Sequence, residues 1–165
     1  MAFMDQSAVS LAPGSLEALI AQRDLNVHFQ PIVSVATGRV LAYEALSRGP
    51  RTSRFSSPLA MFQTARDRGL LASLERVCRE RAFERWVETG LGELLFLNVS
   101  PEVLIDPAHI SGQTLQLLSD HGLTPSQIVI EITEQSPGID PELMAEAAEH
   151  YQSMGFSIAL DDLGD

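Results

Sequence analysis

The chain has 165 residues, 22 acidic and 11 basic side chains, and a formal net charge of −11. This length is enough for one domain with a core of its own, or for a large part of a bigger domain. The acidic balance argues against a nucleic-acid polymer as partner, because such a partner requires a basic surface. No apolar run approaches the length of a membrane span, and no signal peptide is visible. The single cysteine, Cys78, allows no intramolecular disulfide, so we expect a cytoplasmic protein.

The charges are unevenly distributed along the chain. All 11 basic residues are arginines, and all lie at or before Arg85. Residues 86–165 carry 14 acids and no base. Such a segment favours a counter-charge from a cation, from a further segment of polypeptide or from another chain. A well-solvated acidic surface is the equal alternative.

Strand-like and helix-like patterns alternate after a short N-terminal stretch. Residues 1–14 lack periodicity and predict a tail or linker, which leaves 15–165 as the domain. Continuous apolar runs in the later strands are typical of parallel strands buried on both faces. From hydrophobic period and turn residues, we expect a helix at 15–23, strands at 27–35 and 40–47, helices at 58–69 and 70–89, a strand at 94–100, a helical turn from 100, a helix ending near 122, a strand at 128–133, a helix at 140–154 and a strand at 156–162.

Side chains with oxygen donors recur at or near the ends of successive expected strands. They are Glu44, Asn98, Glu131 and Asp161. In a barrel of parallel strands these ends converge on one face, where active sites lie. One acid in such a place is commonly a helix cap or a solvated loop residue. Four successive units with the same kind of group favour a shared site instead.

Converging carboxylates require either that their pKa values rise or that a cation neutralises them. Two carboxylates 4 Å apart repel by roughly 4 kcal/mol at an effective dielectric constant of about 20. Carboxylates together with one Asn carbonyl suit Mg²⁺ or Mn²⁺ and suit zinc poorly. The neighbouring Asp161 and Asp162 offer carboxylates to two ions. Two such ions form an apparatus for in-line cleavage of a phosphoester.

Four ordered motifs resemble those of the EAL domain family. The stretch FQPIVSVATGRVLAYEALSR contains the tripeptide Glu44-Ala45-Leu46, and it is followed by LNVS at 97–100, EITE at 131–134 and DDLGD at 161–165. The resemblance covers about 15–165. It implies a modified (β/α)₈ barrel, of which this α/β chain would form an incomplete part with about five strands, the first of them antiparallel. It also implies hydrolysis of the bacterial messenger cyclic di-GMP to linear pGpG.

The resemblance assigns roles to individual residues. The implied metal ligands, for two Mg²⁺ or Mn²⁺ ions in the complete domain, are Glu44, Asn98, Glu131, Asp161 and Asp162. Asp162 would alternatively orient the attacking water, and Glu134 would hold a lid loop. The implied substrate contacts are Gln30, Leu46 and Arg48, with Arg48 at a phosphate. From the residues alone, Gln30 looks like any strand glutamine.

The sequence also departs from the family pattern. Leu163, Asp165 and the Gly49-Pro50 pair stand where other residues are usual, and the later lysine and glutamate that the family uses are absent. We therefore expect the chain alone to be inactive. We also expect it to form a homodimer or to associate through exposed barrel edges, since five parallel strands cannot close a barrel.

Other interpretations stay open at this point. The chain is either part of a phosphodiesterase or a truncated or degenerate EAL module that binds cyclic di-GMP or a protein without cleavage. An enolase-type carboxylate barrel is disfavoured by the lack of any base after Arg85. Arg51 and Arg54, beside Arg48, form either an anion-attracting rim or a flexible solvated loop. The four histidines have no metal-binding spacing, and each is expected to be a surface or packed residue.

Overall fold

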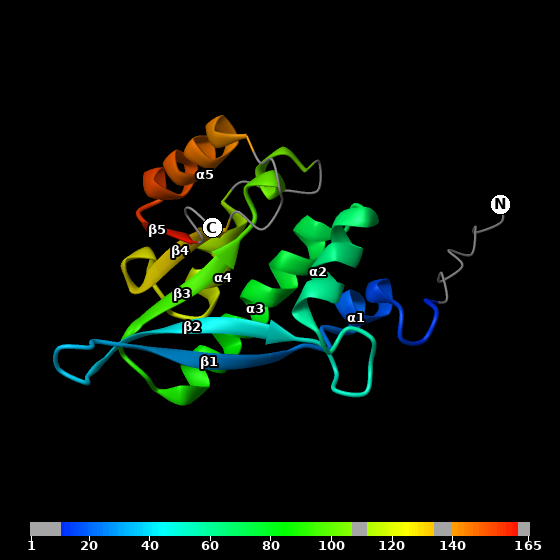
Figure 1. Ribbon diagram of the computed structural model, residues 1–165, viewed down its shortest axis with the longest axis horizontal. Coiled ribbons are helices and arrows are strands. Elements are labelled where there is room, and N and C mark those ends of the chain that lie inside the picture. Colours follow the sequence, from blue (N-terminus) through cyan, green and yellow to red (C-terminus); the bar gives the residue numbers. More distant parts are fainter. Residues whose placement is uncertain (1–10, 107–111, 134–139, 162–165) are drawn as a thin grey trace, which may run out of the picture.

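The computed structural model describes residues 11–106, 112–133 and 140–161 (Figure 1). The predicted elements are all present, with ends shifted by a few residues. In chain order they are α1 (Leu16–Gln22), β1 (Asn26–Val33), β2 (Val40–Arg48), α2 (Pro58–Asp67), α3 (Leu71–Thr89), β3 (Leu94–Val99), η1 (Pro101–Ile105), α4 (Gln113–Asp120), η2 (Pro125–Gln127), β4 (Ile128–Thr133), α5 (Pro141–Ser153) and β5 (Ser157–Asp161).

The strands form one sheet whose spatial order is the chain order, β1-β2-β3-β4-β5. Strand β1 runs antiparallel to β2, and each later pair of neighbours is parallel. Helices in the connections between parallel strands are typical of an α/β fold. The predicted class, with an antiparallel first strand, is confirmed.

One face of the sheet is covered by helices. The ring centroids of Phe29 on β1 and Tyr43 on β2 lie 5.2 and 5.7 Å from that of Trp86 on α3. On β3 and β4, Leu95 and Ile130 have no exposed surface and join the same core. In Figure 1, α3 passes behind the β1–β2 pair, and α5 lies beside β4 and β5. Because side chains alternate along a strand, the polar residues between these positions lie on the opposite face.

A second apolar cluster joins α1, α2 and α3. Leu16, Met61 and Leu74 are fully buried in it. Phe55, in the loop after β2, is 1% exposed in the same cluster. The loop that follows the second strand is therefore anchored in the protein interior rather than free in solvent.

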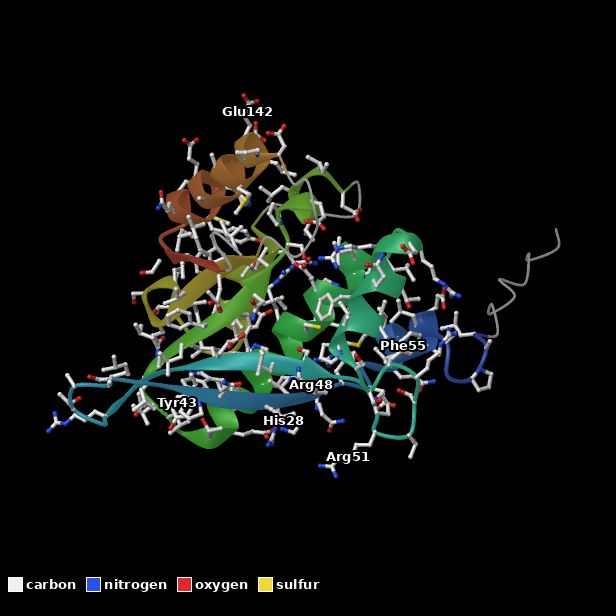
Figure 2. All side chains as sticks on the ribbon, in the orientation of Figure 1. His28, Tyr43, Arg48, Arg51, Phe55 and Glu142 are labelled. Carbon is white, nitrogen blue, oxygen red and sulfur yellow. The ribbon has the colours of Figure 1, made fainter. Side chains whose placement is uncertain are left out.

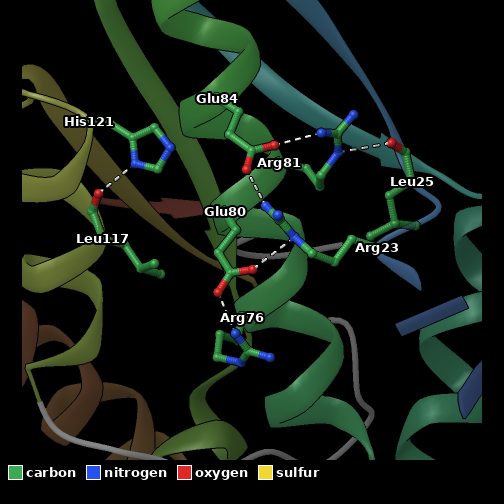
Figure 3. Close-up of polar contacts among 8 residues, drawn as sticks. All are labelled: Arg23, Leu25, Arg76, Glu80, Arg81, Glu84, Leu117 and His121. Carbon is green, nitrogen blue, oxygen red and sulfur yellow. Dashed lines mark hydrogen bonds and ion pairs between the residues drawn. The ribbon is translucent and has the colours of Figure 1, made fainter. Parts of the chain in front are cut away.

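Ion pairs fasten the start of the domain to α3 (Figure 3). Arg23 has a left-handed φ of 53° at the end of α1, and its guanidinium reaches Glu80, at 3.2 Å, and Glu84. Arg76 and Arg81 also bind these two acids. Exposed pairs of this kind contribute about 0.2–1 kcal/mol each, so the packing of the apolar clusters dominates.

Candidate functional site

Four polar residues form a row across the sheet face that the helices leave uncovered. Gln30 on β1 lies opposite Glu44 on β2, and Asn98 on β3 lies opposite Glu131 on β4. The two pairs are joined by a side-chain hydrogen bond, in which Asn98 Nδ2 donates to Glu44 Oε1 at 2.6 Å. Residues that are 54 positions apart in the sequence thus share one site.

Strand β2 extends past Glu44, as the strand predicted at 40–47 does. Strand β2 continues to Arg48, because β1 pairs with it as far as Asn26 opposite Arg48. The parallel pairing with β3 stops earlier, at Ala45 opposite Leu97. The end of β2 therefore projects past β3, and it carries Arg48 beyond the row.

The projecting end of β2 lines a cavity of about 480 Å³ next to Asn98. Leu46 and Arg48 come from β2, and Pro58 and Phe62 come from α2. Arg48 Nη1 donates to the carbonyl oxygen of Ser47 at 2.9 Å. The α3 side of the cavity is lined by Cys78 and by both members of an acid–base pair, Glu75 and Arg79. The apolar walls suit a flat ring, and the Arg48 guanidinium suits an anionic group.

Part of the predicted metal site lies at the end of β5 and beyond it. Asp161 is the last residue of β5, and its backbone pairs with that of Thr133, two positions beyond the pairing of Ala159 with Glu131. Asp162 and Glu134 lie outside the described residues. Within the described ranges, no group of three His, Cys, Asp or Glu side chains is arranged to hold a metal ion.

The described residues of the row nevertheless fit a hard cation. Glu44, Glu131 and the Asn98 amide all offer oxygen donors, and no sulfur or imidazole lies among them. Magnesium, manganese and calcium ions prefer such donors. The bond from Asn98 to Glu44 uses the amide N–H, whereas the amide oxygen is the atom that a cation would bind.

A buried charge pair lies directly under the turn after Asn98, and the sequence analysis missed it. Glu75 and Arg79 on α3 are 3% and 4% exposed, with Arg79 Nη1 3.3 Å from Glu75 Oε2. The backbone N–H of Ser100 donates to Glu75 Oε1 at 3.0 Å. Burial raises the pKa of Glu75, and the Arg79 guanidinium opposes that rise. The sequence did contain a signal for this pair. An acid and a base stand four residues apart within an apolar helical stripe.

A second contact holds the same turn from the other side. Arg66 on α2 donates to Glu102 Oε1 at 2.8 Å and, from Nη2, to Ser100 Oγ at 3.4 Å. Helices α2 and α3 thus both fasten Ser100. This arrangement holds Ser100, two residues beyond Asn98, by contacts to both helices.

The model of the EAL domain family matches residues 14–165. The chain belongs to the EAL domain family. A curated relative, the probable cyclic di-GMP phosphodiesterase PdeB of Escherichia coli, is 33% identical over 157 residues, which cover 90% of this chain and 29% of that protein. The blue light- and temperature-regulated antirepressor BluF of the same organism is 26% identical, over 97% of this chain and 40% of its own length. The chain spans less than half the length of either relative.

Solved EAL structures share the fold. A calcium and cyclic di-GMP complex of Klebsiella pneumoniae BlrP1 is 28% identical, with a TM-score of 0.70 over 86% of this chain and 35% of that one. A standalone EAL protein from Vibrio cholerae, in its c-di-GMP bound form, is 27% identical, with a TM-score of 0.67 over 86% of this chain and 58% of its own. Among the described residues of this EAL chain, no helix is long and apolar enough to cross a membrane.

Proposed function

We propose that this EAL chain contributes the metal-binding row and part of the substrate cavity of a phosphodiesterase that hydrolyses cyclic di-GMP to linear pGpG. The observation that carries the proposal is the hydrogen bond between Asn98 and Glu44, together with the pairing of Asn98 and Glu131. It brings three oxygen-donor side chains from neighbouring strands onto one face. The cyclic di-GMP complexes of related EAL proteins support the choice of substrate.

We propose that Glu44, Asn98, Glu131 and Asp161 hold Mg²⁺ or Mn²⁺, and that Asp162 serves a second ion or orients the attacking water. A bound divalent ion would lower the pKa of a water ligand and neutralise charge that develops on the phosphodiester. The chain's own contribution is orientation. Asn98 fixes the Glu44 carboxylate with its N–H, and the contacts at Ser100 fix the backbone just beyond Asn98.

Substrate contacts are proposed for Gln30, Leu46 and Arg48. Arg48 uses one N–H on the Ser47 carbonyl, and the guanidinium has further N–H groups that can bind a phosphate oxygen. Leu46, with the apolar side chains of α2, offers a wall for a purine ring. The proposal that Glu134 holds a lid loop and the proposal of a cytoplasmic location rest on family resemblance and composition.

Titration calorimetry with Mn²⁺ tests the proposed metal site. Glu44→Gln should weaken Mn²⁺ binding at least tenfold, because it replaces a charged ligand with a neutral one. Glu149→Gln removes the same charge from an exposed position on α5 and is the matched control. Equal effects of the two variants would show that only general charge is involved, and the metal site would be refuted.

Hydrolysis separates the two functions that the family allows. The natural protein that contains this chain should release pGpG from cyclic di-GMP in the presence of Mg²⁺ or Mn²⁺, and Glu44→Gln should abolish that release. Tight binding of cyclic di-GMP without any pGpG would instead identify a module that holds the nucleotide and does not cleave it. Chromatography of the reaction products distinguishes these outcomes.

A further inference from the structure

The arginines fall into two groups. Seven of the 11 form ion pairs with carboxylates, and these are Arg23, Arg66, Arg68, Arg76, Arg79, Arg81 and Arg85. Among the described residues, Arg39, Arg48, Arg51 and Arg54 have no acidic partner. Acids outnumber bases two to one in this chain, so the three unpaired arginines that lie together at the end of β2, Arg48, Arg51 and Arg54, point to an external anion.

Two of these arginines line a polar cavity of about 430 Å³ at the end of the β1–β2 pair. Its lining consists of Asn26, His28, Arg48, Gly49, Arg51 and Ser56 and includes no carboxylate. Across the ladder, Asn26 lies opposite Arg48 and His28 lies opposite Leu46, so His28 and Arg48 share the face of the metal-binding row. Figure 2 shows His28 and Arg48 on the strands and Arg51 at the outer edge of the loop that follows β2.

The loop that carries Arg51 is closed by its own hydrogen bonds. The N–H of Gly49 donates to the carbonyl of Phe55 at 3.2 Å, and the N–H and hydroxyl of Ser53 both donate to the carbonyl of Pro50 at 2.9 Å. A Cβ atom on Gly49 would lie 2.5 Å from the Phe55 carbonyl oxygen, so the closure requires glycine. Because Phe55 is buried, Arg51 lies in a loop that is held at both ends, by strand β2 and by Phe55. Of the two alternatives for this segment, the geometry favours an ordered, anion-attracting rim over a flexible solvated loop.

Arg54 belongs to a different environment. Its guanidinium carbon lies 4.6 Å from the centre of the Phe55 ring, a cation–π contact, and the polar cavity does not include it. The lining side chains with N–H groups that can bind an anion are therefore His28, Arg48 and Arg51, together with the Asn26 amide.

We propose that His28 and Arg51 join Arg48 in binding a phosphate group of the nucleotide. The identity of the ligand rests on the proposed function. Guanidinium and imidazole N–H groups donate charge-assisted hydrogen bonds to phosphate oxygens, and Arg can bind two oxygens at once. Arg48 stands four residues beyond Glu44 on the same strand, roughly 13 Å at the usual rise of about 3.3 Å per residue. The pocket therefore receives an anionic group other than the one at the metal-binding row.

Two probes, inorganic phosphate and cyclic di-GMP, test the pocket in calorimetric titrations without divalent ions. Arg51→Gln and His28→Gln should each weaken both probes about tenfold, the loss of one charge-assisted hydrogen bond. Arg39→Gln is the matched control, since it removes the same charge from an exposed arginine near the β1–β2 turn. That variant should change either dissociation constant less than twofold. Both altered positions are exposed, and thermal unfolding curves should coincide with that of the parent chain.

Three results would overturn the inference. The first is a loss of affinity in Arg39→Gln equal to that in Arg51→Gln. The second is a loss of affinity for inorganic phosphate in Arg51→Gln and His28→Gln while their affinity for cyclic di-GMP is unaffected. The third is that these two variants bind both probes as the parent chain does, or that the parent chain binds neither probe. Mn²⁺ affinity, measured on the same proteins without phosphate, reports on the proposed function separately. Failure of the row to bind Mn²⁺ would refute the phosphodiesterase proposal, and the phosphate titrations would still decide the pocket.

Discussion

Asn98 connects the two halves of the described site, because it donates to Glu44 on one side and pairs with Glu131 on the other. We expect Asn98→Ala to weaken Mn²⁺ binding at least tenfold, since the change removes an oxygen ligand and frees the Glu44 carboxylate. Asn98→Asp keeps an oxygen donor and should bind Mn²⁺ more tightly than Asn98→Ala. Calorimetry measures both constants, and an affinity of Asn98→Ala equal to that of the parent chain would contradict the assignment.

The only cysteine offers a residue-level test of packing. Burial raises the pKa of the Cys78 thiol to about 12, so hardly any thiolate is present at neutral pH. A thiol-specific disulfide reagent at pH 8 should therefore react slowly with the folded chain, and the rate should rise at least a hundredfold in denaturant. Absorbance of the released thiolate follows the reaction. Immediate labelling of the folded chain would contradict the raised pKa of this thiol, which lines the 480 Å³ cavity.

At the scale of elements, α3 supports the site through a buried charge pair. Removing one partner of such a pair leaves the other charge buried and unpaired, which costs about 3–5 kcal/mol. We expect Glu75→Ala to lower the free energy of unfolding by about that amount, because Arg79 and the Ser100 N–H both lose their acceptor.

Denaturation in urea measures this loss. Glu88→Gln breaks an exposed ion pair with Arg85 on the same helix and should cost less than about 1 kcal/mol. The double variant Glu75→Leu with Arg79→Met should recover most of the stability, since apolar residues of similar volume can replace a buried pair. If Glu75→Ala lowered the free energy of unfolding only slightly, the result would indicate that the pair is in contact with water rather than buried.

At the scale of the whole molecule, the sheet has two open edges among the described strands, β1 and β5. Leu160 on β5 is 49% exposed. Unpaired strand edges with apolar side chains tend to pair with strands of other molecules. The net charge of −11 opposes nonspecific self-association. We therefore expect a polypeptide of these 165 residues to form dimers or larger species at micromolar concentration. Light scattering should show this, and Leu160→Lys should reduce it; a monomer that shows no association would contradict the expectation.

Local pattern alone was sufficient for the elements and for three members of the row, Glu44, Asn98 and Glu131, whereas Gln30 was indicated only by the family resemblance. Turn residues and hydrophobic period located the strands, because these depend on neighbours in the chain. The acids and Asn98 stood out because they recur after apolar runs. Their convergence followed from the expectation of parallel strands, which the sheet order bears out.

Other features were decided by contacts between distant segments. Strand β2 continues to Arg48 because β1 pairs with it as far as Asn26, and its sequence does not show that the pairing with β3 stops at Ala45. The Glu75–Arg79 pair is buried, and Glu75 accepts from the N–H of Ser100, 25 positions away in the sequence. His28 looked like any surface histidine until the ladder placed it beside Arg48 and the closed loop placed Arg51 at the same cavity. The residue types and their local order lie in the sequence, whereas their partners depend on long-range packing that only the folded chain specifies.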